Sequence, residues 1–161
     1  MMLYDIDMKT IYGDGYLFTK ENKTDLYEID PEYPNLCKSI GRSDVIRVLN
    51  GYFLFSKKLK DILSNDKSFK FNNVNIFYKK KLLSNDYYLV KVTNKIELVD
   101  YKNSIITGNP FFDKLVFKLE NIEEHALVVS DKDDDYYVYY TENFRELVKS
   151  HDIDIDLLEI F

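Results

Sequence analysis

Two segments of the sequence, 52–63 and 137–148, can be laid over each other without a gap at an offset of 85 residues. Each begins with a run of aromatic and aliphatic residues typical of a strand, and that run ends at Ser56 in the first copy and at Thr141 in the second. A hydroxyl at this point can accept a hydrogen bond from a free amide of the first helical turn. The repeat therefore predicts a strand that leads directly into a capped helix, used twice.

Apolar residues follow each predicted cap at the third, sixth and seventh positions, which places one apolar stripe on a short helix. They are Leu59, Ile62 and Leu63 in the first copy, and Phe144, Leu147 and Val148 in the second. Strand-like runs flank both copies, at 45–49 and 71–78 around the first and at 126–130 and 153–161 around the second. Asn50-Gly51 favours a tight hairpin between 45–49 and the first copy.

Further strand-like runs lie between the copies, at 87–93, 95–99 and 115–120, with a loop at 108–110. The sequence thus predicts an α+β fold with a mostly antiparallel sheet, two short capped helices and two related strand-helix-strand halves. No linker rich in glycine, serine or proline divides the chain. We therefore expect a single domain over residues 1–161, with halves at about 1–84 and 85–161.

The content of Cys and His restricts the chemistry. One Cys and two His in 161 residues exclude a disulfide framework and any metal site that needs several thiolate or imidazole ligands. We expect no catalytic residue, no metal and no cofactor. The first ten residues lack the features of a signal peptide, and no run reaches the roughly 18 apolar residues of a membrane span. A cytoplasmic protein that binds no membrane is the expectation.

The formal net charge of −6 hides an asymmetry along the chain. Residues 38–102 contain 6 acidic and 14 basic residues, whereas residues 120–161 contain 13 acidic and 3 basic ones. Lysines at 57, 58, 60 and 79–81, near Tyr78 and Tyr87, raise the alternative of a nucleic-acid-binding patch. The acidic total argues against it, and we expect no nucleic acid as a partner.

Two acidic patterns suggest metal chemistry as an alternative. Residues 131–142 place carboxylates at positions 1, 3, 5 and 12 of a calcium loop, but Tyr136 stands where the sharp turn needs glycine, so we interpret them as an acidic hairpin. Asp152, Asp154 and Asp156 alternate with isoleucines beside His151. Clustered aspartates occur in two-metal hydrolases, which makes a small metal-dependent hydrolase the main rival function. We favour the interpretation that residues 152–156 form an edge strand whose aspartates face the solvent.

Residues 43–63, from Ser43-Asp44-Val45 through Gly51 and Ser56 to Leu63, resemble a segment of the immunity proteins of bacterial polymorphic and contact-dependent toxin systems. Residues 117–119, 127–130 and 144–160 are similar to the closing pattern of that group: strand, Val-Ser, helix and terminal strand. In the family, Val-Ser leads directly into the helix, so the resemblance implies that residues 131–140 are a surface insertion. It also implies an intracellular, non-catalytic protein that binds and neutralises a cognate toxin.

We therefore hypothesise that the partner is a cognate protein toxin with a basic active surface, as on a nuclease, and that the acidic hairpin and the end of the chain occlude it. The candidate residues are Asp131, Asp133, Asp134, Asp135, Tyr137 and Tyr139. Acidic groups steer a basic partner into contact, and tyrosines are enriched at interface hot spots. Strand alternation would place Tyr137 and Tyr139 on one face and Tyr136 and Tyr140 on the other, and it leaves open which pair is exposed. A regulatory module with another protein partner is a further alternative.

Overall fold

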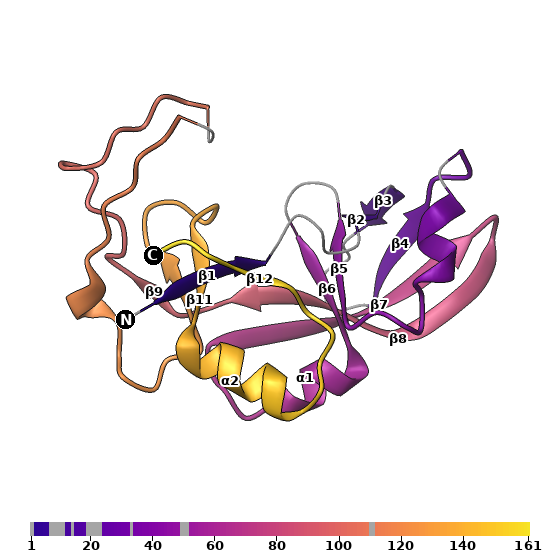
Figure 1. The fold of residues 1–161 in the computed structure, drawn as a ribbon. Coiled ribbons are helices and arrows are strands. Elements are labelled where there is room, and N and C mark those ends of the chain that lie inside the picture. Colours follow the sequence, from indigo (N-terminus) through magenta and orange to yellow (C-terminus); the bar gives the residue numbers. More distant parts are fainter. Residues whose placement is uncertain are drawn as a thin grey trace.

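The computed structural model describes residues 2–6, 12–13, 15–18, 24–32, 34–48, 52–109 and 112–161. Over these ranges the chain forms two β-sheets, two α-helices and two short 3-10 helices (Figure 1). This arrangement confirms the predicted α+β class. No helix in the described ranges is long and apolar enough to cross a membrane.

The larger sheet has seven strands among the described residues. In spatial order they are β2 (Tyr12–Gly13), β5 (Val45–Val48), β6 (Phe53–Ser56), β8 (Lys81–Val92), β7 (Phe69–Tyr78), β4 (Asp25–Ile29) and β3 (Gly15–Phe18). Neighbouring strands pair antiparallel, except that β2 runs parallel to β5 and β4 runs parallel to β7. The long hairpin of β7 and β8 forms the spine of this sheet and extends to the right in Figure 1.

The smaller sheet has five strands in the part of the chain that the structure describes. Their order is β12 (Leu157–Glu159), β1 (Leu3–Ile6), β11 (Val138–Thr141), β10 (Val128–Asp131) and β9 (Lys95–Ile96). Only β9 and β10 pair in parallel. The predicted antiparallel pairing is thus confirmed, but it is divided between two sheets, because the chain leaves β8 at Val92 and enters the second sheet at Lys95.

Both copies of the sequence repeat form the predicted unit. In the first, β6 leads into α1 (Lys57–Leu63), and Ser56 Oγ accepts a hydrogen bond from the Leu59 amide at 3.2 Å. In the second, β11 leads into α2 (Glu142–Ser150), and Thr141 Oγ1 accepts from the Phe144 amide at 3.5 Å. Leu59 and Phe144 are both fully buried. The caps therefore direct equivalent apolar residues into the core.

The similarity of the two copies extends to their neighbours. The β5–β6 hairpin in the larger sheet corresponds to the β10–β11 hairpin in the smaller one. In each case a two-residue strand, β2 or β9, pairs in parallel with the first strand of the hairpin. The Asn50-Gly51 turn of the first hairpin lies outside the described residues. The repeat is therefore a common supersecondary unit placed once in each sheet.

One core joins the two sheets and both helices. It contains Tyr4, Ile6, Val45, Phe55, Leu59, Leu63, Phe69, Val90, Val128, Tyr140, Phe144, Val148 and Ile153. Figure 1 shows α1 and α2 on the same side of the molecule, where both cover this core. A second cluster lies in the larger sheet, and a third lies on the far face of the smaller sheet.

Three predicted strands are wrong or too long, and of residues 95–99 only Lys95 and Ile96 form a strand. Residues 115–120 form no strand; they contribute an isolated bridge between Val99 and Phe117 and the 3-10 helix η3 (Leu119–Asn121). Of residues 153–161, only β12 is a strand, because the chain first turns Ile153 into the core and bonds its amide to the Val148 carbonyl. Between β9 and η3 the chain leaves the body, and residues 100–109 and 112–116 form a projecting segment that we call the arm (Figure 1).

Candidate functional site

The acidic hairpin of the sequence is the connection between β10 and β11. Asp133, Asp134 and Asp135 are exposed there, whereas Asp131, at the end of β10, has no exposed surface. We call residues 133–136, which include the exposed Tyr136, the acidic turn. The aspartates predicted as one binding group thus divide into three on the surface and one in the interior.

Asp131 is held by four hydrogen bonds. Its Oδ1 accepts from the amides of Leu98 and Val99 at 3.0 and 2.8 Å. Its Oδ2 accepts from the Tyr101 hydroxyl at 2.6 Å and from the Asp133 amide at 3.1 Å. Burial acts to raise the pKa of Asp131, but these hydrogen bonds outweigh it and hold the pKa below its usual value. Asp131 is therefore an ionised anchor that joins the acidic turn to the base of the arm.

The burial of the tyrosines differs from the strand alternation expected from the sequence. Tyr136 is 66% exposed, but Tyr137 and Tyr139 are buried in the cluster beneath the arm, and Tyr140 is buried in the central core. The Tyr139 ring meets Phe117 edge to face at 5.2 Å. Both faces of β11 are covered, because the cluster beneath the arm packs against one face and the central core packs against the other. Tyr136 precedes the strand, and alternation does not govern it.

The exposed part of the acidic turn is ordered by local contacts. Asp134 Oδ1 accepts a hydrogen bond from the Tyr136 amide at 2.9 Å. Asp135 forms an ion pair with Lys95 at 2.6 Å, although 79% of the Asp135 side chain is exposed. The turn thus presents three carboxylates and one aromatic ring on a fixed backbone. Such a surface suits contact with a basic partner.

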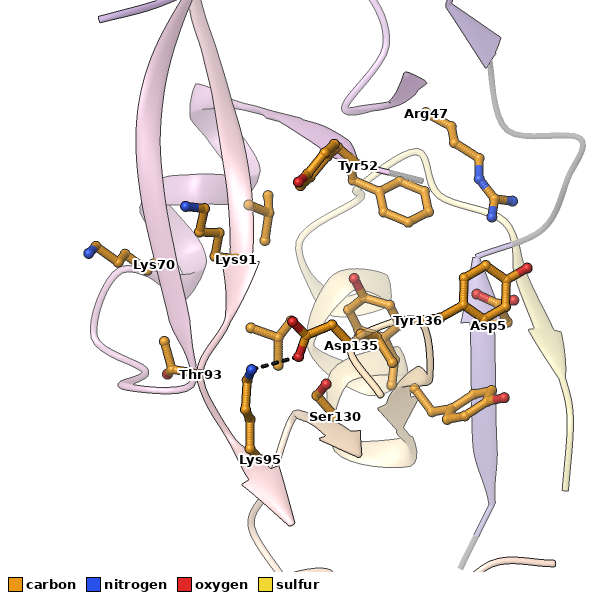
Figure 2. Close-up of a pocket in the computed structure, with 16 residues that line it drawn as sticks. Asp5, Arg47, Tyr52, Lys70, Lys91, Thr93, Lys95, Ser130, Asp135 and Tyr136 are labelled. Atoms are coloured by element: carbon orange, nitrogen blue, oxygen red, sulfur yellow. Dashed lines mark hydrogen bonds and ion pairs between the residues drawn. The ribbon is translucent and has the colours of Figure 1, made fainter. Parts of the chain in front are cut away.

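A groove of about 810 Å³ opens beside the acidic turn, where the two sheets meet (Figure 2). One wall comes from β6 and β8 and includes Tyr52, Phe53 and Val90; the other comes from β10 and β11. Lys95 of β9 and Asp135 form an ion pair among the lining residues, and the Arg47 guanidinium lies 5.3 Å from the centre of the Phe53 ring.

Lys70 and Lys91 border the groove but do not add charge to its interior. They are direct cross-strand partners in β7 and β8, and their neighbours Phe69 and Val90 pack in the central core. Alternation therefore turns the two lysines to the opposite face, and Figure 2 shows their amino groups pointing away from the other lining side chains. The groove is lined by aromatic and aliphatic side chains together with charged and polar ones, a combination that suits a binding surface.

The residues of the rival hydrolase hypothesis lie on one exposed stretch of the chain. Asp152, Asp154 and Asp156 are exposed along the chain between α2 and β12, and His151 ends α2 with Nδ1 3.0 Å from the Leu147 carbonyl oxygen. None of them lines the groove or the smaller cavity beside the arm. Within the described ranges, no three Asp, Glu, His or Cys side chains are grouped so as to hold a metal ion.

The lysines of the nucleic-acid alternative are dispersed. Lys57, Lys58 and Lys60 lie on α1, whereas residues 79–81 form the tip of the β7–β8 hairpin, at the other end of these strands (Figure 1). Tyr87, expected beside them, is buried in the larger sheet and donates a hydrogen bond to the Ser43 carbonyl. The basic middle of the sequence is therefore not one basic surface.

Comparison with known proteins supports the resemblance noted in the sequence. The model of an immunity protein family, Imm11, matches residues 19–149. This range includes both copies of the repeat, the arm and the acidic turn, and it excludes β1 and β12. No curated protein gives a match to the chain. Because the family model covers well over half of the chain, the protein belongs to the Imm11 family of immunity proteins.

Proposed function

We propose that this protein binds a cognate bacterial toxin inside the cell that makes both, and neutralises it by occluding the toxin's active surface. The observation that carries the proposal is the Imm11 match over residues 19–149. Under this proposal the protein acts by binding and performs no catalysis of its own. A binding role is supported by the position of His151 and the C-terminal aspartates, which lie outside the lining of the groove.

We further propose that the acidic turn contacts a basic surface of the toxin. Asp133, Asp134 and Asp135 place three carboxylates on a short exposed segment beside Tyr136, and the third of them is ion-paired with Lys95. Charges at the rim of an interface mainly accelerate association and set its dependence on salt, whereas an exposed tyrosine supplies contact area. The basic groups around the active site of a toxin that acts on an anionic substrate, such as a nuclease, would complement this turn.

Three residues of the original hypothesis take an indirect part in this proposal. Asp131, Tyr137 and Tyr139 are buried, so they support the acidic turn from beneath and do not contact the toxin. Asp131 bonds the Asp133 amide, and Tyr139 packs against Phe117 at the base of the arm. Their substitution would therefore alter toxin binding through the position of the turn.

Two matched triple variants test the acidic turn. D133N/D134N/D135N removes three charges from the turn, and D152N/D154N/D156N removes three exposed charges from the segment before β12. Asparagine keeps the acceptor that Asp134 offers to the Tyr136 amide. The probe is the toxin domain encoded by the gene beside the one for this chain, and its affinity is measured by titration calorimetry at low and physiological salt.

The turn variant should weaken binding more than tenfold at low salt, with a smaller loss at high salt, since screening reduces rim electrostatics. The C-terminal variant should bind within about twofold of the wild-type chain, because isolated surface charges contribute little. Equal affinities of the two variants would remove the turn from the interface. A wild-type chain that neither binds nor inhibits the adjacent toxin would contradict the proposed function itself.

A further inference from the structure

The arm exposes more large apolar side chains than a free surface loop of its length requires. Tyr101, Ile105, Ile106, Phe112 and Val116 are all exposed. Phe112 is 67% exposed and Ile106 is 46% exposed. Single exposed apolar residues are ordinary, but five of them on one projecting element make this element a candidate surface for another molecule.

The arm keeps its shape through its own hydrogen bonds. Ile105 and Lys114 exchange two backbone hydrogen bonds of 2.8 Å, as directly opposed residues of an antiparallel pair do. Asp113 Oδ1 accepts from both the amide and the hydroxyl of Thr107, at 2.6 and 2.8 Å. Ser104 Oγ accepts from the Val116 amide at 2.9 Å. The exposed side chains are therefore carried on a prepared backbone, which lowers the entropy cost of binding.

The base of the arm is fixed to the body. Val99 is buried, and Phe117 packs edge to face on Tyr139 and on Phe161, with ring centres 5.2 and 6.0 Å apart. Asp131 bonds Tyr101 at the start of the arm. The arm thus has a buried base and an exposed outer part, which is the geometry of an inserting element.

The arm is continuous with the acidic turn. A cavity of about 220 Å³ lies between them and is lined by Tyr101 and Lys102 from the arm and by Lys132 and Asp133 from the β10–β11 connection. The arm itself is electrically balanced, with Asp100 and Asp113 against Lys102 and Lys114. The combined surface therefore has an apolar projection beside a negative rim.

We propose that the arm docks into an apolar cleft of the toxin, and that basic residues at the border of this cleft face the acidic turn. This inference rests on the proposed function and names the part of the surface that carries most of the contact. Ile105, Ile106 and Phe112 fill the cleft, and the acidic turn orients the approach. Buried aromatic and aliphatic anchors surrounded by polar groups are the usual arrangement of binding hot spots.

A matched pair of double variants tests the inference. I106S/F112S removes the two apolar groups of the arm. F18S/L82S removes a phenylalanine and an aliphatic residue of similar exposure, 49% and 48%, from the larger sheet. Both variants are compared with the wild-type chain by thermal unfolding, by sedimentation of the free chain, and by titration calorimetry with the toxin domain encoded beside this gene.

The arm variant should unfold within a few degrees of the wild-type chain and lose at least tenfold in affinity, while F18S/L82S binds within about twofold. Hydrogen exchange in the wild-type complex should show protection of amides 103–107. If the wild-type chain binds the toxin and I106S/F112S binds equally well, the arm inference is wrong and the proposed function stands. If the free chain dimerises and the arm variant does not, the arm docks on a second copy, and the inference is also wrong. Absence of wild-type binding would contradict both proposals.

Discussion

The Tyr101 hydroxyl donates a hydrogen bond of 2.6 Å to Oδ2 of Asp131 and thereby joins the arm to the acidic turn. Tyr101 belongs to the arm, and Asp131 precedes the turn by two residues. Burial and the neighbouring carboxylate both raise the pKa of Tyr101, so its hydroxyl stays protonated and remains a donor at neutral pH. One buried carboxylate thus sets the relative position of the two surfaces that we propose contact the toxin.

The variant Asp131→Asn should lower the free energy of unfolding by about 1.5–3 kcal/mol, the range for hydrogen bonds to a charged group. In the wild-type chain both carboxylate oxygens of Asp131 accept hydrogen bonds from backbone amides. Asparagine keeps only one acceptor oxygen, and its NH₂ group, itself a donor, would face backbone amides that then lack an acceptor. Urea unfolding monitored by circular dichroism measures the change. Asp133→Asn is the control, since its side chain is exposed, and it should change stability by less than about 0.5 kcal/mol.

The contribution of Asp131 should also depend on pH. Its pKa in the folded protein lies below the usual value of 3.8, so the unfolded chain takes up this proton first as the pH falls. The stability from Asp131 is therefore complete above about pH 5 and declines as the pH falls through the unfolded pKa toward the folded one. The difference in unfolding free energy between the wild-type chain and Asp131→Asn should shrink between pH 5 and pH 3. A difference that stays constant over this interval would show that the charge of Asp131 is not what stabilises the fold.

The sequence predicted local structure well because the responsible residues are close together in the chain. Ser56 and Thr141 lie three residues from the amides that they cap, so their role could be inferred from spacing alone. The role of Asp131 could not, because its partners at Leu98, Val99 and Tyr101 lie about thirty residues away, in a segment with no regular element. The sequence pattern of residues 131 and 133–135 does not distinguish the buried aspartate from the exposed ones, because the difference depends on their tertiary partners.

The tyrosines and the arm show two further limits. Tyr137 and Tyr139 are buried because residues from a distant segment, such as Leu98 and Val99, pack on their face of β11, and this packing is a long-range property. The arm contains residues with strand propensity, and 115–120 was predicted as a strand on that basis. Its opposing segment supplies only isolated bridges, so propensity without a regular partner does not produce a strand. The family, in contrast, could be predicted from the resemblance of residues 43–63 to immunity proteins, and the Imm11 match confirms it.

The two helix caps should make similar contributions to the free energy of unfolding. Ser56→Ala and Thr141→Ala should each lower the free energy of unfolding by about 1–2 kcal/mol, at the upper end of the range for caps. The reason is that each hydroxyl has a second partner: Ser56 donates to Asp44 at 2.6 Å, and Thr141 donates to the Ala126 carbonyl at 2.5 Å. Thermal and urea unfolding would measure both losses.

The exchanges Ser56→Thr and Thr141→Ser keep a hydroxyl at both caps and test whether the two positions are equivalent. Each should retain most of the stability that alanine removes. If Ser56→Thr or Thr141→Ser lowers the free energy of unfolding as much as the alanine variant does, the hydroxyl is not the source of the stabilisation. Ser150→Ala, at the exposed end of α2, serves as the reference for loss of a peripheral hydroxyl.

The tip of the β7–β8 hairpin carries lysines in an unfavourable backbone conformation. Lys79 and Lys80 have φ angles of 47° and 65°, and the paired residues Tyr78 and Lys81 close this two-residue turn. Positive φ at both central positions favours Asn-Gly, because a side chain with a Cβ costs about 1–2 kcal/mol in this region. The variant K79N/K80G should therefore raise the free energy of unfolding by about 1 kcal/mol, after allowance for loss of the exposed Lys79 contact with the Tyr78 ring. Lys81→Gln, which removes a charge at the first residue of β8, should leave stability nearly unchanged.

Because we place toxin binding at the arm and the acidic turn, K79N/K80G should also bind the adjacent toxin with wild-type affinity, and a loss of affinity would place the lysine tip in the interface.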